Sequence, residues 1–110
     1  MTSYIWITTQ FEGYHSYPNA PKDVDFLKNR HRHIFGVKVW IEVSVLKDRD
    51  IEFFQFKRFV DFVIATTNLN NKSCECIADR LYIDINSKYP NRKIKISIDE
   101  DKENGCEKEY

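Results

Sequence analysis

The sequence predicts an α+β fold in which an antiparallel four-stranded sheet carries two helices on one face. Segments near both ends of the chain alternate apolar and polar residues with a period of two, as half-buried strands do. Between them, apolar residues recur at the three-to-four-residue spacing of a helix. The predicted order is strand, strand, helix, helix, strand, strand (ββααββ), and residues 1–110 are expected to form a single domain.

The first two predicted strands are long. Residues 3–15, "SYIWITTQFEGYH", place Ile5, Ile7 and Phe11 on one face of a strand. Residues 31–46 alternate again and predict a second strand. Its apolar face comprises Phe35, Val37, Val39, Ile41, Val43 and Val45.

Two helices follow the second strand. The polar segment "KDRD" at 47–50 predicts a turn, and residues 53–65 then show helical spacing. Ser73 is a suitable N-cap for the second helix, because its hydroxyl can accept a hydrogen bond from a free backbone N–H. The expected core positions are Phe53, Phe56, Val60 and Val63 in the first helix and Ile77, Leu81 and Ile85 in the second.

The chain is predicted to end in a hairpin. "KIKISI" alternates cleanly and places Ile94, Ile96 and Ile98 on one face. The tetrapeptide 102–105, "KENG", then predicts a turn into a short last strand, because Asn-Gly favours tight turns. Residues 16–23, "SYPNAPKD", form a predicted loop between the first two strands.

The charge balance limits the classes of partner. Seventeen basic and seventeen acidic residues cancel, which argues against general attraction to nucleic acid or to an anionic membrane. No stretch approaches the ~18 apolar residues of a membrane span, and the N-terminus lacks the pattern of a signal peptide. The three cysteines are an odd number and do not predict a disulfide framework. We therefore expect a cytoplasmic protein.

The three histidines are expected to meet. His31 and His33 are two residues apart, so both project from the apolar face of the second strand. His15 shares its face with Ile5, Ile7 and Phe11, so pairing of the first two strands would bring three imidazoles together. Three neutral imidazoles with an open fourth position suit zinc. The alternative is that strand-end histidines only form hydrogen bonds to water or to the backbone.

The stretches around these histidines resemble a known family. "FEGYH" followed by "HRHIFGVKVWIEV" is similar to the F-x-A-x-H … H-G-H-x-Y/F-x-V-x-V pattern of the 6-pyruvoyl-tetrahydropterin synthase and 6-carboxy-tetrahydropterin synthase family. "RDIEFFQFKRFV", "NLNNKSCECIADRL" and "IKISIDED" resemble later family segments in the same order. The resemblance implies the tunnelling fold, assembled into a barrel-like ring (trimer to hexamer).

The resemblance also implies roles for individual residues. The zinc ligands fall on His15, His31 and His33, and the carboxylate that anchors a pterin or purine-like ring falls on Glu100. An ionised carboxylate suits that role because it offers paired acceptors to two parallel N–H donors. Nearby residues expected to contribute to the ligand-binding pocket are Ser73, Cys74, Glu75 and Arg32.

The chain departs from the family at the catalytic positions. Leu27 occupies the position of the catalytic cysteine, and no cysteine occurs before Cys74. Ala65 and Thr66 stand where the family has its activating Asp-His pair. A thiolate acting as general base needs both groups. Arg32 and Lys72 replace a glycine and a proline, either adding positive charge for a phosphorylated ligand or simply facing solvent.

Three functions are consistent with this pattern. The first is an oligomeric protein that sequesters a pterin, purine or small nucleotide in inter-subunit pockets, with zinc on the histidines. The second is a zinc-dependent lyase related to the family, in which other groups, such as Asp25 or a zinc-bound hydroxide, replace the missing base. The third is a structural ring subunit, which leaves the three histidines without a role. The catalytic residues of the second alternative are unknown.

Overall fold

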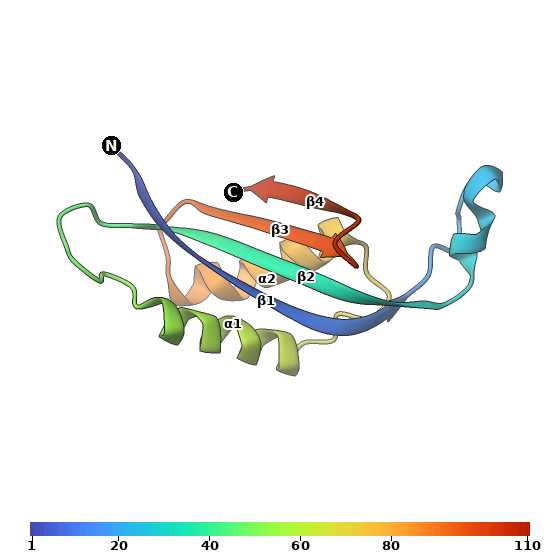
Figure 1. Ribbon diagram of the computed structural model, residues 1–110, viewed down its shortest axis with the longest axis horizontal. Coiled ribbons are helices and arrows are strands. Elements are labelled where there is room, and N and C mark those ends of the chain that lie inside the picture. The colour runs from blue at the N-terminus through green and yellow to red at the C-terminus, as the bar shows by residue number, and fades with distance from the viewer.

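The computed structural model describes residues 1–110 and contains one antiparallel sheet of four strands with two α-helices packed against it (Figure 1). The strands lie in the order β1-β2-β3-β4, so consecutive strands are neighbours. The elements are β1 (Ser3–His15), η1 (Lys22–Lys28, a 3₁₀ helix), β2 (His31–Val43), α1 (Phe53–Thr66), α2 (Cys74–Lys88), β3 (Ile94–Glu100) and β4 (Asn104–Glu109). The α+β class and the ββααββ order of the main elements are confirmed.

The core lies between the sheet and the two helices. Alternate residues of the strands point toward α1 and α2, and the side chains on this face join one cluster of 18 buried residues. The largest fully buried side chains include Phe35 and Ile41 of β2, Phe56 of α1 and Leu81 of α2. The apolar face of the sheet, set by the two-residue period of the strands, therefore packs against the apolar faces of α1 and α2, as the sequence predicts.

The second strand is shorter than predicted. It ends at Val43, and the next residues form a turn in which the Ser44 backbone N–H donates to the Asp50 carboxylate. Val45 is consequently half exposed and does not extend the apolar face. Phe53 is also exposed, because it begins α1 and lies outside the buried stripe of that helix.

The last hairpin turns earlier than predicted. Asp101 and Lys102 adopt the left-handed backbone conformation, with φ of 56° and 62°, and they form the turn. Asn104 and Gly105 instead begin β4, where they pair with Glu100 and Asp99. Glycine is required at 105 for a different reason: a Cβ there would lie 2.2 Å from the Ile98 carbonyl oxygen. Close strand packing, rather than turn geometry, explains this glycine.

The first hairpin projects beyond the rest of the sheet. β2 pairs with β3 only from Phe35 to Ile41, whereas β1 and β2 stay paired as far as His15 and His31 (Figure 1). The connection between them contains η1, a helix that the predicted loop did not include. Neither α-helix has the length and apolar character that crossing a membrane requires.

Candidate metal and ligand site

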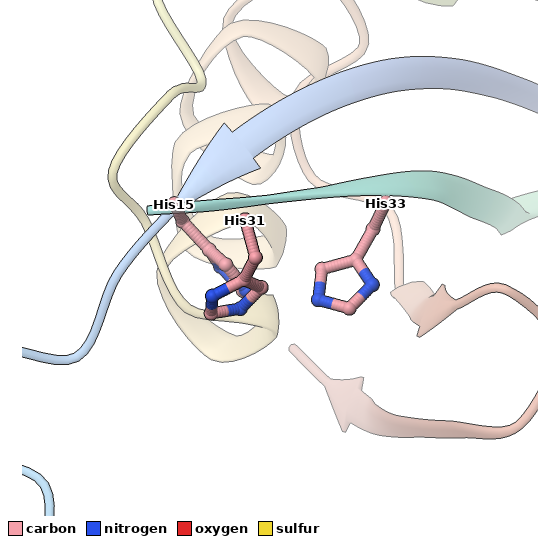
Figure 2. Close-up of side chains that lie close together, drawn as sticks. All are labelled: His15, His31 and His33. Atoms are coloured by element: carbon pink, nitrogen blue, oxygen red, sulfur yellow. The ribbon is translucent and has the colours of Figure 1, made fainter. Parts of the chain in front are cut away.

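The pairing of β1 with β2 brings the three histidines together. His15 lies directly opposite His31 in the antiparallel register, and His33 is the next residue along β2 on the same face. The ring centroids are 4.6 Å apart for His15 and His31, 5.0 Å for His15 and His33, and 4.8 Å for His31 and His33. Figure 2 shows the three side chains leaving the ends of the two strands toward the same side. The predicted convergence is confirmed.

Each imidazole is held by a hydrogen bond from its Nδ1 atom. His15 donates to the carbonyl oxygen of Lys72 at 2.8 Å, and His31 donates to that of Asn29 at 2.7 Å. His33 donates to the carboxylate of Asp101 at 2.7 Å. A carbonyl or carboxylate oxygen can only accept, so each Nδ1 carries the proton of the neutral ring.

This tautomer leaves the Nε2 lone pair free on all three rings. One nitrogen from each ring lies within 4.8 Å of those of the other two, which is close enough for one metal ion to contact all three. The Nε2 atoms of His31 and His33 are buried and have no hydrogen-bond partner. A buried polar atom without a partner is costly, and a bound cation would satisfy both atoms at once. The residues therefore fit a metal ion.

The loop before α2 fixes the position of His15. Asn71 donates its backbone N–H to the carbonyl of Tyr14, and Asn70 accepts from the Tyr14 backbone N–H through its side chain. These bonds tie the loop to the end of β1 and bring Lys72 against His15. Ser73 then caps α2 by accepting from the Cys76 backbone N–H, as predicted.

Glu100, at the end of β3, faces the histidines. One carboxylate oxygen lies 3.4 Å from Nε2 of His15 and the other lies 3.3 Å from Nε2 of His33. Glu100 forms no ion pair with lysine or arginine, and its remaining polar contact is the thiol of Cys74 at 3.8 Å. Lone pairs on Nε2 and on a carboxylate repel at this separation, so the arrangement favours a cation or a hydrogen-bond donor between them.

The acidic groups around the histidines differ in their surroundings. Hydrogen bonds from His33 and from the Ile34 backbone N–H hold the pKa of Asp101 below its usual value. Burial, together with the charge of Glu100, raises the pKa of Cys74 to about 12. Cys74 is therefore a protonated thiol near neutral pH, and the carboxylates supply the negative charge of the site.

A cavity of about 460 Å³ opens beside this cluster. It includes two of the histidines and the carboxylate of Glu100, and it extends over the start of α2 and the start of β4. Its lining residues are His15, Ser16, Tyr17, Leu27, His31, Ser73, Cys74, Glu75, Glu100, Asn104 and Gly105. The volume falls within the range of about 300–1,000 Å³ that is typical of small-molecule sites.

Most of the predicted ligand-binding residues lie in this cavity, but Arg32 does not. Ser73, Cys74, Glu75 and Glu100 all line it. Arg32 projects from the opposite face of β2 and pairs with Glu12 at 3.1 Å, because neighbouring residues in a strand alternate faces.

The residues that the sequence comparison placed at the family's catalytic positions differ in their relation to the cavity. Leu27 lines the cavity and places an apolar side chain there. Ala65 and Thr66 lie exposed at the end of α1 and are absent from the lining. Asp25 is exposed in η1 and is likewise outside the lining.

The sequence interpretation missed Asp101 and the backbone acceptors of the histidines. Asp101 follows Glu100 directly in "SIDED", and this doubled acidic pair was the available signal. The carbonyls of Asn29 and Lys72 carried no signal, since every residue has one. No protein-family model matches the chain, and no similar protein was found among curated sequences.

Proposed function

We propose that this protein is an oligomeric metal-binding protein of the tunnelling-fold class that holds a pterin, a purine or a small nucleotide. Zinc binds to His15, His31 and His33, and Glu100 anchors the ring of the ligand. The protein sequesters this ligand and does not convert it. The observation that carries the proposal is the convergence of three imidazoles, one nitrogen of each lying within 4.8 Å of those of the other two, whose tautomers are set by Nδ1 hydrogen bonds.

Nitrogen donors favour a transition metal such as zinc over magnesium or calcium, which prefer oxygen ligands. Three neutral imidazoles are a recurrent zinc ligand set, and they leave a fourth position for water or a ligand atom. The nearby carboxylates of Glu100 and Asp101 add negative charge beside a divalent cation. When bound, the zinc ion supplies a positive centre that attracts an oxygen or nitrogen atom of the ligand.

Glu100 has the properties of an anchor for a planar heterocycle. Its two oxygens accept hydrogen bonds, and no lysine or arginine pairs with them. The amidine edge of a pterin or guanine presents two parallel N–H donors, which match a carboxylate in the same way that a guanidinium does. The adjoining cavity of about 460 Å³ has room for a ligand of this size.

The side chains that line the cavity favour sequestration over catalysis. Leu27 lines the cavity where the resembling family has its cysteine, and a leucine side chain cannot transfer a proton. Cys74 is the only thiol in the lining, and its pKa of about 12 keeps it protonated. Asp25, which could replace the missing general base, is exposed and lies outside the cavity lining.

Free sheet edges support assembly into a ring. β1 and β4 each pair with only one neighbour, so both outer edges carry unpaired backbone groups. Pairing of β4 in one subunit with β1 in the next would continue the sheet around a ring of three to six subunits. Light scattering coupled to size-exclusion chromatography measures the molar mass of the assembly. A monomer at micromolar concentration would contradict the ring.

The decisive experiment identifies what the purified protein carries. We expect metal analysis to find zinc in a stoichiometric amount, and mass spectrometry of heat-released material to find a pterin, purine or nucleotide. Incubation with dihydroneopterin triphosphate then separates binding from catalysis: we expect binding without product. Turnover of this compound would instead support the zinc-dependent lyase, and the absence of both zinc and ligand would leave a structural subunit.

A matched pair of variants tests the metal site. His31→Ala removes one Nε2 ligand, and we expect it to lower the zinc content and the zinc affinity. Asn104→Ala changes another lining residue of the cavity without touching a histidine, and it should retain zinc. Equal zinc content in the wild type and His31→Ala would remove the metal from the proposal.

A further inference from the structure

The three histidines differ in the charge of the group that holds Nδ1. His15 and His31 donate to neutral backbone carbonyls, whereas His33 donates to a carboxylate, that of Asp101. The distance from His33 Nδ1 to Asp101 Oδ2 is 2.7 Å, as expected for a charge-assisted hydrogen bond. His33 is therefore the one ligand whose electron density is increased by an anion.

Asp101 is itself held rigidly on the strand that bears His33. Its second oxygen accepts from the Ile34 backbone N–H at 2.8 Å, and its own backbone N–H donates to the Ile34 carbonyl at 2.8 Å. The residue sits in the turn after β3 with φ of 56°, a conformation that aspartate and asparagine tolerate better than most residues. These contacts direct one carboxylate oxygen at His33 and occupy the other.

We infer that Asp101 is a positioning residue for the metal site: its carboxylate orients His33, keeps the proton on Nδ1 and strengthens Nε2 as a metal ligand. This inference rests on the proposed function, since it assigns a role toward the same metal ion. A carboxylate–histidine–metal arrangement fixes both the tautomer and the rotation of the ring. It also places a negative charge one ring away from a divalent cation.

Replacing Asp101 by asparagine should disturb this arrangement in a specific way. The Ile34 N–H and the His33 Nδ1–H approach different oxygens of Asp101, and asparagine places an oxygen at only one of these two positions. If the amide nitrogen faces His33, it can only donate to Nδ1, which moves the ring proton to Nε2 and blocks that lone pair. Asp101→Gly removes the side chain altogether and keeps the turn, because glycine adopts positive φ without strain.

The experiment compares zinc affinity, measured by competition with a chromophoric chelator, in the wild type, Asp101→Asn, Asp101→Gly and Asp99→Asn. Asp99 is the control because it carries one negative charge in the same hairpin and its carboxylate accepts from the backbone N–H of Lys102, not from a histidine. We expect zinc affinity to fall about 10- to 100-fold in both Asp101 variants. We expect it to stay near wild type in Asp99→Asn.

Two further readouts separate positioning from a general loss of stability. The visible spectrum of the Co²⁺-loaded protein should change in the Asp101 variants, because it reports ligand geometry. The rise in melting temperature on zinc binding should shrink, whereas a folding defect alone would lower the metal-free and the zinc-bound values together.

The outcomes distinguish this inference from the proposed function. Unchanged zinc affinity and an unchanged Co²⁺ spectrum in both Asp101 variants would overturn the role of Asp101 and leave the metal site intact. A wild-type protein that binds neither zinc nor Co²⁺ would overturn the proposed function and the role of Asp101 together.

Discussion

The carboxylate of Glu100 and the imidazole of His33 lie 3.3 Å apart, although the two residues come from opposite halves of the chain. The contact forms because β3 lies against β2 in the sheet, with Glu100 paired to Phe35. This relationship joins the proposed metal ligands to the proposed ligand anchor in one site, and it provides the basis for the first prediction.

Glu100→Gln should weaken ligand binding without removing zinc. The substitution replaces one acceptor oxygen by an amide donor and removes the charge, so the paired acceptance of two N–H groups is lost. A hydrogen bond to a charged group contributes about 1.5–3 kcal/mol, which corresponds to a loss of affinity of roughly 10-fold or more. Isothermal titration with the heat-released ligand measures the change. Glu103→Gln, at an exposed position in the same turn, is the control, and equal affinity in both variants would contradict the anchor role.

Zinc should stabilise the protein against heat. A metal that binds only the folded state contributes about 2.7 kcal/mol when its free concentration is 100 times its dissociation constant. We therefore expect the melting temperature to fall after treatment with a chelator and to recover when zinc is added. Magnesium should not restore it, because that ion prefers oxygen ligands in octahedral geometry. Recovery by zinc in His31→Ala would show that the stabilising ion binds elsewhere.

Phe35→Ala should affect both the fold and the histidines. Phe35 is almost completely buried, stacks on Phe11 with centroids 5.2 Å apart, and makes T-shaped contacts with the rings of His15 and His33. Truncating a buried phenylalanine costs about 3–5 kcal/mol of unfolding free energy. Urea unfolding measures this loss. Phe54→Ala, at an exposed position, should change the unfolding free energy by about 0.5 kcal/mol or less, and similar losses in the two variants would contradict this packing.

Acid should weaken the connection between Asp50 and Arg92. The Arg92 guanidinium lies 2.7 Å from the Asp50 carboxylate and, with the Ser44 backbone N–H, lowers the pKa of Asp50 below its ordinary value of 3.8. Because the folded-state pKa is lowered, the stabilisation is present above pH 3.8 and is lost as the pH falls through the folded-state pKa.

The measurement that tests this prediction is the unfolding free energy in urea of the wild type and Asp50→Asn, from neutral pH to below pH 3.8. We expect the wild type to be more stable near neutral pH and the difference to shrink in acid. Asp48→Asn, at an exposed position in the same turn, controls for the loss of one charge. A difference between the wild type and Asp50→Asn that stays constant with pH would contradict the role of this ion pair.

Much of the site could be predicted from local patterns. The two-residue period of β1 and β2 by itself places His15, His31 and His33 on the apolar face, and the structure brings them together there. The same period places Arg32 on the other face, where it pairs with Glu12 instead of lining the cavity. Periodicity is readable from sequence because each strand residue takes its face from its neighbours alone.

Other features depended on contacts that no local pattern encodes. The Asn-Gly pair indicated a turn over residues 102–105, but the chain turns at Asp101 and Lys102. That placement lets Asp101 reach both His33 and Ile34. Each tertiary hydrogen bond of this kind contributes about 0.5–1.5 kcal/mol, or more when one partner is charged, and together they outweigh a local preference for a turn at Asn-Gly.

The sequence by itself determined the α+β class, the core faces of the strands and helices, and the shared face of the three histidines. Only the tertiary structure decided which atoms accept from each Nδ1, and hence that the lone pair of each ring is on Nε2. It also decided that Glu100 lies against two of these rings. The physical reason is that side-chain periodicity is a property of the local backbone, whereas a hydrogen-bond partner is set by segments that meet only when the sheet and the loop before α2 have packed.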